Sequence, residues 1–327
     1  MSGISPIIGV RGCEHVKDVP VSVSLAFELS DRPSPSPNES RMFNDFHYQD
    51  AFSRNVGWVT ETELQRLRGK RIAIAGLGGV GGAHLLALTR LGIGNFNISD
   101  LDVFEVANFN RQFGAMMSQL SRPKVDVMSE MALDINPELD IRRFTLGIDE
   151  TNIDAFLHGV DLYIDGLDFF VMDVREAIFA ACAERRIPAI TAAPLGWGVA
   201  MLAFLPGGMT FEDYFQLKGQ EQLEKLHRFL VGLSPTDLQL GSLVDASRLD
   251  IKKQRGPSTT VGVYLCAAFA AGNAVKILLE RGEVPCVPTS LHFDVFSNAY
   301  ALVEREGGIR HPEMQRRLRA LREQQPN

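Results

Sequence analysis

The sequence predicts an α/β fold in which a mostly parallel sheet is flanked by helices. A short apolar run at residues 71–75 leads into the glycine-rich stretch Gly76-Leu-Gly-Gly-Val-Gly81. A helical pattern follows, and a second β run occupies residues 95–100. Strand, glycine turn, helix and strand in this order form a βαβ unit, and the same alternation continues along the chain, which indicates a parallel sheet covered by helices.

Local patterns set the bounds of the predicted elements. Thr60 with Glu63 three residues later is a capping box, which starts a helix over residues 61–68. The helix after the glycine turn is expected at residues 84–91, because Gly92 ends it. The remaining strands are expected at residues 140–146, 162–165, 189–191, 201–205 and 290–296, and the remaining helices at 125–136, 153–157, 171–185 and 261–279.

The predicted domain organisation is one extended unit with an irregular beginning. Residues 31–40 read DRPSPSPNES, a composition that resists both helix and sheet, so residues 1–45 are expected to form an irregular N-terminal arm. The main domain is expected at residues 46–305, with an insertion at about residues 206–256. Residues 306–327 form a charged tail that is expected to be a helix or disordered.

Composition excludes several classes of protein. The chain has 327 residues and a net charge of −7, which argues against a broad cationic surface for nucleic acid. We expect no membrane span and no signal peptide, because the longest apolar stretch, residues 261–271, is short. The four cysteines lie far apart without a CxxC pair, which predicts a cytoplasmic protein with reduced thiols and no structural zinc site.

The glycine turn is the first motif with chemical content. Glycines let a backbone approach a phosphate closely, and the following helix presents free N–H groups and the positive end of its dipole. Asp100 ends the second strand, where a carboxylate can hold the hydroxyls of a ribose. This pattern alone is a general Rossmann fingerprint, and its alternative is that the glycines only tighten a strand–helix turn.

The residues after Asp100 favour a nucleoside triphosphate over a nicotinamide cofactor. Arg111, Gln112 and Lys124 follow closely in sequence. A dinucleotide has no need of two cations here, whereas they can neutralise a triphosphate and the charge that builds up when a nucleophile attacks it. A nicotinamide-dependent dehydrogenase is therefore disfavoured.

Several of these elements, in this order, resemble the ThiF-type, E1-like superfamily of ATP-dependent activating enzymes. The resemblance depends on the glycine turn, the string Asp100-Leu-Asp-Val-Phe-Glu-Val-Ala-Asn-Phe-Asn-Arg-Gln112, and Lys124 thirteen residues after Arg111. It covers about residues 52–205, with a weaker continuation at 257–300. It implies a Rossmann-like adenylation domain that uses Mg²⁺ and ATP, usually as a homodimer.

The resemblance also assigns roles to individual residues. It implies that the turn glycines Gly76, Gly78, Gly79 and Gly81 approach the nucleotide and that Asp100 binds its ribose. It implies that Asn108, Arg111 and Gln112 line the nucleotide pocket, with Arg111 and Lys124 on phosphates. The alternative for Arg111 is a surface ion pair, and for Asp100 a strand-end turn.

Three further positions match the family less directly. Asp168 corresponds to the aspartate that helps hold Mg²⁺, and its alternative is a helix N-cap. Arg54 corresponds to an arginine that relatives extend into the partner subunit's ATP site, and its alternative is a surface ion pair. Trp197 lies where relatives place the substrate carboxylate, and it can shape the acceptor pocket or simply pack.

The cysteines depart from the family pattern. Many relatives carry a cysteine in the segment that corresponds to residues 206–260, and this chain has none there. Cys182 and Cys266 are expected to be core residues, which leaves Cys286 in a loop as the only late thiol. The family's zinc-binding cysteine pairs are also missing.

The sequence therefore favours an adenylyltransferase that activates a carboxylate as an acyl-adenylate without a catalytic cysteine. The substrate is expected to be a peptide, a ubiquitin-like carrier or another small carboxylate; a modified tRNA base is disfavoured by the net charge. The alternatives are an E1-type activator of a sulfur carrier or ubiquitin-like protein that uses a thiol, and a nucleotide-binding scaffold that transfers nothing.

Overall fold

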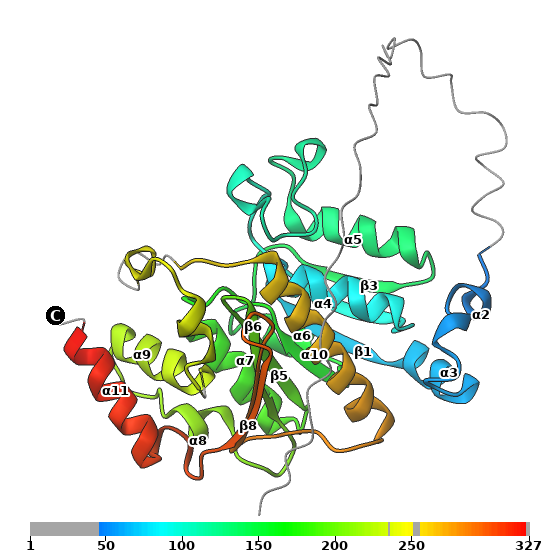
Figure 1. Ribbon diagram of the computed structural model, residues 1–327. Coiled ribbons are helices and arrows are strands. Elements are labelled where there is room, and N and C mark those ends of the chain that lie inside the picture. Colours follow the sequence, from blue (N-terminus) through cyan, green and yellow to red (C-terminus); the bar gives the residue numbers. More distant parts are fainter. Residues whose placement is uncertain (1–45, 235, 251–255, 325–327) are drawn as a thin grey trace, which may run out of the picture. The chain divides into compact units, whose positions relative to one another are not determined.

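The computed structural model describes residues 46–234, 236–250 and 256–324, and Figure 1 shows their arrangement. The predicted arm at residues 1–45 lies outside the described residues. The strands form one sheet in the order β3-β2-β1-β4-β5-β6-β7-β8. They are β1 (Arg71–Ala75), β2 (Asn95–Ser99), β3 (Asp140–Phe144), β4 (Leu162–Asp165), β5 (Ala189–Leu195), β6 (Gly198–Phe204), β7 (Thr289–Asp294) and β8 (Ala299–Glu304).

Strand direction divides the sheet into two parts. β1 to β5 are parallel, whereas β6, β7 and β8 add to them as an antiparallel meander. The α/β class with a mostly parallel sheet is confirmed. Since the chain leaves β1 toward β2 on one side and reaches β4 on the other, the sheet has a topological switch point between β1 and β4, the place where such sheets bind ligands.

Helices cover both faces of the sheet. They are α2 (Tyr48–Ala51), α3 (Glu61–Gly69), α4 (Gly79–Arg90), α5 (Lys124–Ile135), α6 (Ile153–Leu157), α7 (Met172–Glu184), α8 (Phe211–Phe215), α9 (Gln222–Leu233), α10 (Thr260–Leu279) and α11 (Pro312–Gln324). Alternate residues of β1 face opposite sides, as the period of a strand requires. Ile72 and Ile74 join the core formed with α4, α5 and α10, whereas Ala73 and Ala75 join the core formed with α6 to α9 and α11.

Several elements differ from the prediction, three of them for a clear physical reason. The helix expected at 84–91 was placed too late, because Gly78 is the N-cap and the glycine-rich stretch itself forms the first turn of α4. β5 continues to Leu195 through Pro194, a residue usually typical of strand edges. β8 was missed, because it is an edge strand with alternating half-buried and exposed residues that directly follows a four-residue turn.

Two predicted segments fold onto the main body. The insertion forms α8 and α9 and then two short 3₁₀ helices. The charged tail forms α11, whose Met314 and Leu318 are fully buried in the core that also contains α9. α10 is long and apolar enough to cross a membrane by length and composition, but half of that stretch is buried, because it packs on α4, β5 and β6.

A buried ion pair joins β4 to α7. Asp165 is the last residue of β4, and its Oδ2 accepts a hydrogen bond from Nε of Arg175 at 2.8 Å, with both side chains only 2% exposed. Asp165 also accepts a hydrogen bond from the Thr191 hydroxyl at 3.0 Å. The face of the Arg175 guanidinium lies 4.5 Å from the ring centroid of Phe229 in α9. Each charge therefore has the partners that a buried position requires.

This arrangement predicts a large stability loss when Arg175 is replaced. Arg175→Met keeps the volume but leaves the Asp165 carboxylate buried without its partner, so the free energy of unfolding should fall by about 3–5 kcal/mol. Urea denaturation followed by circular dichroism measures this. Arg185→Met is the matched control, because Arg185 pairs with the exposed Asp154 and such pairs contribute about 0–1 kcal/mol. Equal losses in both variants would contradict the prediction.

Candidate functional site

The carboxyl ends of β1, β2 and β4 meet at one edge of the sheet, which we call the site edge. Gly76 follows β1 directly and has a φ of +84°, a conformation that favours glycine. Its N–H donates to the Ser99 carbonyl oxygen at 2.8 Å. A methyl group on Gly81 or on Gly166 would overlap the carbonyl oxygen of Gly76, so backbone packs on backbone here. The turn is thereby held tightly between β1, α4 and the loop after β4.

The N-terminus of α4 is available to an anion. Gly78 is its N-cap, and no side chain caps the helix among the described residues. The first N–H groups of a helix have no intrahelical partner, and they carry the positive end of the helix dipole. The helix is twelve residues long and starts inside the glycine turn. This backbone therefore fits the phosphate groups of a nucleotide.

Asp100 ties the glycine turn to the loop after β2. Its Oδ2 accepts the Leu77 N–H at 2.6 Å, and its Oδ1 accepts the Asp102 N–H at 2.8 Å. Burial raises the pKa of Asp100 above its ordinary value, while these two N–H groups and the charge of Lys124 oppose that rise. The carboxylate is therefore fixed in place beside the turn, where a ribose hydroxyl can reach it.

Lys124 is brought to the same place by a short antiparallel contact. It is the first residue of α5, and it follows the bridge between Val103 and Pro123. The side chain is nearly buried, and its Nζ donates to the Asp102 carboxylate at 2.9 Å. Asp102, which the sequence left without a clear role, therefore holds the Lys124 ammonium beside the glycine turn.

Gln112 and Arg111 lie over the glycine turn. The amide nitrogen of Gln112 is 3.5 Å from where a Cβ on Gly78 would stand, and Cγ of Arg111 is 3.6 Å from the corresponding point on Gly79. The Gln112 amide oxygen is buried and has no hydrogen-bond partner among the described residues. The Arg111 guanidinium donates to the Ala107 carbonyl oxygen at 3.1 Å. A polar ligand over the turn can thus meet both side chains.

Asn108 has a local role in this structure. Its side-chain oxygen accepts the Glu105 N–H at 3.0 Å and closes a 3₁₀ turn at residues 106–108. That turn carries the chain toward Arg111. Its proposed contact with the nucleotide stays a prediction.

Asp168 lies on the loop after β4, next to the glycine turn. Its Oδ1 accepts the Phe170 N–H at 3.1 Å, and the residue is exposed. The backbone beneath it is held by Arg175, whose guanidinium donates to the carbonyl oxygens of Leu167 at 2.9 Å and Asp168 at 3.0 Å. Sequence reasoning missed Arg175, although an arginine ten residues after Asp165 was a visible signal for a buried partner.

Asp168 fits a magnesium ion only together with ligand oxygens. No group of three or more His, Cys, Asp or Glu side chains that could hold a metal lies within the described part of the chain. One exposed carboxylate next to a turn whose backbone fits phosphate groups matches the way Mg²⁺ is usually held, by one or two carboxylates plus substrate phosphates.

Arg54 is not brought to the site of its own chain. It belongs to a 3₁₀ turn at residues 53–55, and the neighbouring Asn55 donates to the carbonyl oxygen of Arg90 at 2.9 Å. Arg90 ends α4, whose twelve residues span about 18 Å from the glycine turn. Arg54 therefore lies near the opposite edge of the sheet, and its role in a partner subunit stays a prediction.

The described cysteines are either buried or distant from the site edge. Burial raises the pKa of the Cys182 thiol to about 12 and that of Cys266 well above its ordinary value, so neither is a thiolate near neutral pH. Cys286 precedes β7 at the edge opposite the site edge, because β7 reaches the site edge only at Asp294. Cys13 lies outside the described residues.

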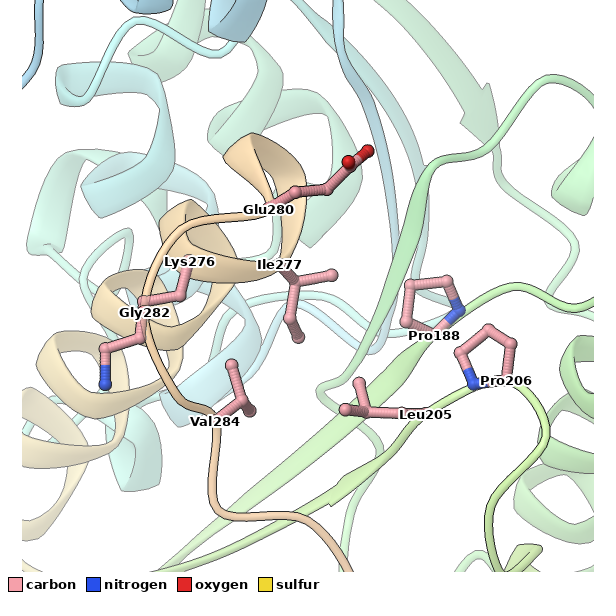
Figure 2. Close-up of a pocket in the computed structure, with 8 residues that line it drawn as sticks. All are labelled: Pro188, Leu205, Pro206, Lys276, Ile277, Glu280, Gly282 and Val284. Atoms are coloured by element: carbon pink, nitrogen blue, oxygen red, sulfur yellow. The ribbon is translucent and has the colours of Figure 1, made fainter.

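The opposite edge also has a cavity of about 270 Å³. Figure 2 shows Ile277 facing Leu205, Pro188 and Pro206 across it, while the carboxylate of Glu280 points away. It contains none of the residues that the sequence assigned to the site. His84 lies in α4 and is fully buried. Burial lowers its pKa to about 3, so the ring is neutral and gives no positive charge for a phosphate.

The chain is similar in sequence to one family of known proteins. The family model described as "ThiF family" matches residues 52–313. The tRNA threonylcarbamoyladenosine dehydratase of Bacillus subtilis is 33% identical over 141 residues, which cover 43% of this chain and 55% of that protein. Ubiquitin-like modifier-activating enzyme 5 of Drosophila ananassae is 36% identical over 245 residues, which cover 68% of this chain and 54% of that enzyme. The chain thus spans about half the length of these curated relatives.

Solved structures are similar in fold. Escherichia coli MccB with ATP superposes with a TM-score of 0.56 at 18% identity, covering 83% of this chain and 72% of that one. The E. coli tRNA N6-threonylcarbamoyladenosine dehydratase superposes with a TM-score of 0.52 at 22% identity, covering 71% of this chain and 95% of that one.

Proposed function

Since this chain belongs to the ThiF family, we propose that it is an ATP-dependent enzyme of the E1-like type that activates a substrate carboxylate as an acyl-adenylate and passes the acyl group on without a protein thiol. The observation that carries this proposal is the convergence of Asp100, Gln112 and Lys124 on an uncapped helix N-terminus at the switch point of the sheet. Such a place suits a nucleotide whose phosphates lie on α4.

The proposed reaction needs positioning and charge neutralisation more than a protein nucleophile. A carboxylate oxygen of the substrate attacks the α-phosphorus of ATP, the bond from that phosphorus to the bridging oxygen breaks, and pyrophosphate leaves with the electron pair. Both reactants are anions, so the cations of Arg111 and Lys124 reduce their repulsion and stabilise the charge of the transition state. Asp168 would hold Mg²⁺, which supplies further charge neutralisation when it is bound.

The acyl substrate is proposed from the kinds on which relatives act. Related proteins include a tRNA threonylcarbamoyladenosine dehydratase and a ubiquitin-like modifier-activating enzyme, and a solved structure of Escherichia coli MccB contains MccA. The net charge of −7 favours a peptide or a carrier protein over tRNA for this chain. We also propose a homodimer in which Arg54, which lies near the far end of the roughly 18 Å long helix α4 from its own glycine turn, serves the partner's site.

The first prediction concerns the two cations. Arg111→Ala and Lys124→Ala should each lower the rate of ATP–pyrophosphate exchange by about 100-fold or more, because removing one preformed electrostatic contact to the transition state costs that much. Exchange is measured with radiolabelled pyrophosphate and candidate carboxylates. Lys276→Ala is the matched control, since Lys276 lines the cavity of Figure 2 at the opposite edge. Turnover that is retained in either site variant would contradict the assignment.

The second prediction separates direct transfer from a thiol route. A variant in which all four cysteines are replaced by Ala or Ser should retain exchange and overall turnover, because the described thiols are buried or lie at the opposite edge. Loss of overall turnover with retained exchange, accompanied by a thioester on the wild-type protein in mass spectrometry, would support an E1-type thiol mechanism instead.

The third prediction concerns Arg54. Arg54→Ala and Asp168→Ala homodimers should both be inactive, whereas their mixture should recover about a quarter of wild-type activity, because half of randomly mixed dimers are heterodimers with one intact site. The mixture is assayed for exchange after subunits have equilibrated. Activity that equals the mean of the two separate variants would show that Arg54 has no role in a partner's site.

A further inference from the structure

Two exposed aromatic rings lie together at the site edge, beyond the nucleotide residues. Trp197 is in the turn between β5 and β6, and Phe296 is in the turn between β7 and β8. Their ring centroids are 5.8 Å apart with an interplanar angle of 28°, a stacked pair. The residues are 36% and 65% exposed, respectively. Stacked aromatic rings that remain open to solvent can bind a further apolar group on their free surfaces.

The two turns that carry the rings are fixed to each other. The Val295 N–H donates to the Trp197 carbonyl oxygen at 3.4 Å. Asp294 is fully buried, and its Oδ1 accepts hydrogen bonds from both the N–H and the hydroxyl of Ser297, each at 2.8 Å, which closes the second turn. The geometry of the pair is therefore set by backbone and buried contacts, so no large ordering of the rings is needed before they bind a ligand.

The same turns are connected to the nucleotide residues. The Thr259 hydroxyl donates to the Gly196 carbonyl oxygen at 2.6 Å, and the Asn110 side chain donates to the Ser258 carbonyl oxygen at 2.9 Å. Asn110 directly precedes Arg111. A continuous series of contacts thus runs along the site edge from the arginine over the glycine turn to the aromatic pair.

The strand order gives the separation between the two places. β1 carries the glycine turn, and the β5–β6 turn lies between two and three strands away in the order β1-β4-β5-β6. At a strand spacing of about 4.8 Å, this separation is roughly 12 Å. An extended chain advances about 3.4 Å per residue, so about four residues cover that distance.

The surroundings of the pair favour a peptide over a nucleic acid. Val295 and Leu240 beside it are exposed aliphatic residues. Leu240 follows Gln239, whose Cβ lies 3.7 Å from where a Cβ on Gly196 would stand. The arginines of α11 nearest this segment are engaged by carboxylates, as in the pair between Arg317 and Asp237 at 2.6 Å. Nucleic acid recognition requires cations for the phosphates beside the stacking rings, and among the described residues the neighbours Val295 and Leu240 are aliphatic instead.

We propose that Trp197 and Phe296 form a specificity site for a peptide substrate, and that they bind an apolar side chain about four residues before the reacting C-terminal carboxylate. The proposal rests on the proposed function for the direction of the substrate chain, whose carboxylate is placed at the glycine turn and not at Trp197, the position that the family resemblance implies. The peptide backbone then extends along the site edge past Asp168. Peptides too short to reach the pair gain nothing from it.

Binding is tested without chemistry by fluorescence. The chain contains two tryptophans, so Trp58→Phe leaves Trp197 as the only strong emitter. The probes are synthetic hexapeptides ending in a free glycine carboxylate, with Leu, Phe, Ser or Asp at the fourth position from the C-terminus, titrated in the presence of ATP. The Leu and Phe peptides should change the Trp197 emission and bind about tenfold more tightly than the Ser and Asp peptides. Phe296→Ala should remove that preference.

The matched control is Leu302→Ala. Leu302 is an exposed apolar residue on β8, about 10 Å along the strand from the site edge, so its loss should leave the preference unchanged. Equal affinity for all four hexapeptides, a preference unchanged by Phe296→Ala, or binding of a carboxylate-bearing tRNA in place of the peptides would overturn the proposal.

Exchange kinetics separate this proposal from the proposed function. In ATP–pyrophosphate exchange, Trp197→Ala should raise KM for the Leu hexapeptide about tenfold, leave kcat nearly unchanged, and leave the kinetics of the matching dipeptide unaffected. Exchange that occurs equally with dipeptide and hexapeptide would overturn the specificity site and keep the proposed function. Preferential binding of apolar hexapeptides without any exchange would keep the specificity site and overturn adenylation.

Discussion

The carbonyl oxygen of Gly76 lies against the backbone of Gly81 and of Gly166, and the site depends on this contact. A side chain at Gly81 or Gly166 would separate the turn after β1 from the first turn of α4 or from the loop after β4. With the three backbones in contact, the N-terminus of α4 and the loop that carries Asp168 lie side by side. Asp100 strengthens the same arrangement from β2, since its carboxylate accepts the Leu77 N–H. The glycine turn proposed to bind phosphate and the proposed magnesium ligand are thus set by one backbone contact.

The charged pairs around this contact differ in how far their side chains are buried. Asp165 and Arg175 are fully buried and compensate each other, so they fix the backbone of the loop and leave no net charge at the site. Lys124 is also nearly buried, but its partner Asp102 has a 70% exposed side chain. An ammonium held by an exposed carboxylate can exchange it for a phosphate at lower cost than one in a closed pair. The buried Asp165–Arg175 pair therefore has both charges compensated inside, whereas the nearly buried Lys124 ammonium has an exposed partner that a phosphate can replace.

The sequence was sufficient for the fold class, and it also predicted that the residues proposed for the nucleotide would lie near the glycine turn. The order of strand, glycine turn and helix determines where a phosphate fits, and Asp100, Arg111, Gln112 and Lys124 all lie within 25 residues of that unit. Their positions relative to the glycine turn can therefore be predicted from the local sequence. The sequence could not give the start of α4, because glycine has a low helix propensity and the first turn of this helix consists mostly of glycines. It could not give Arg175, Asp102 or Phe296 a role, because each acts through a contact made by folding. β8 was missed since only one of its faces is protected.

The insertion at residues 206–256 connects the two ends of the site. Its helix α9 places Phe229 under the Arg175 guanidinium, and that guanidinium holds the carbonyl oxygens of Leu167 and Asp168. Its later part places Gln239 against the turn that carries Trp197. Thr236 in between contacts Nδ1 of His292 on β7 at 2.6 Å. One inserted segment therefore packs both beneath the loop proposed to hold magnesium and beside the aromatic pair. A change in this segment that accommodates a different substrate must also preserve the packing on Arg175, so the proposed peptide site and the loop proposed to hold magnesium depend on the packing of the same insertion.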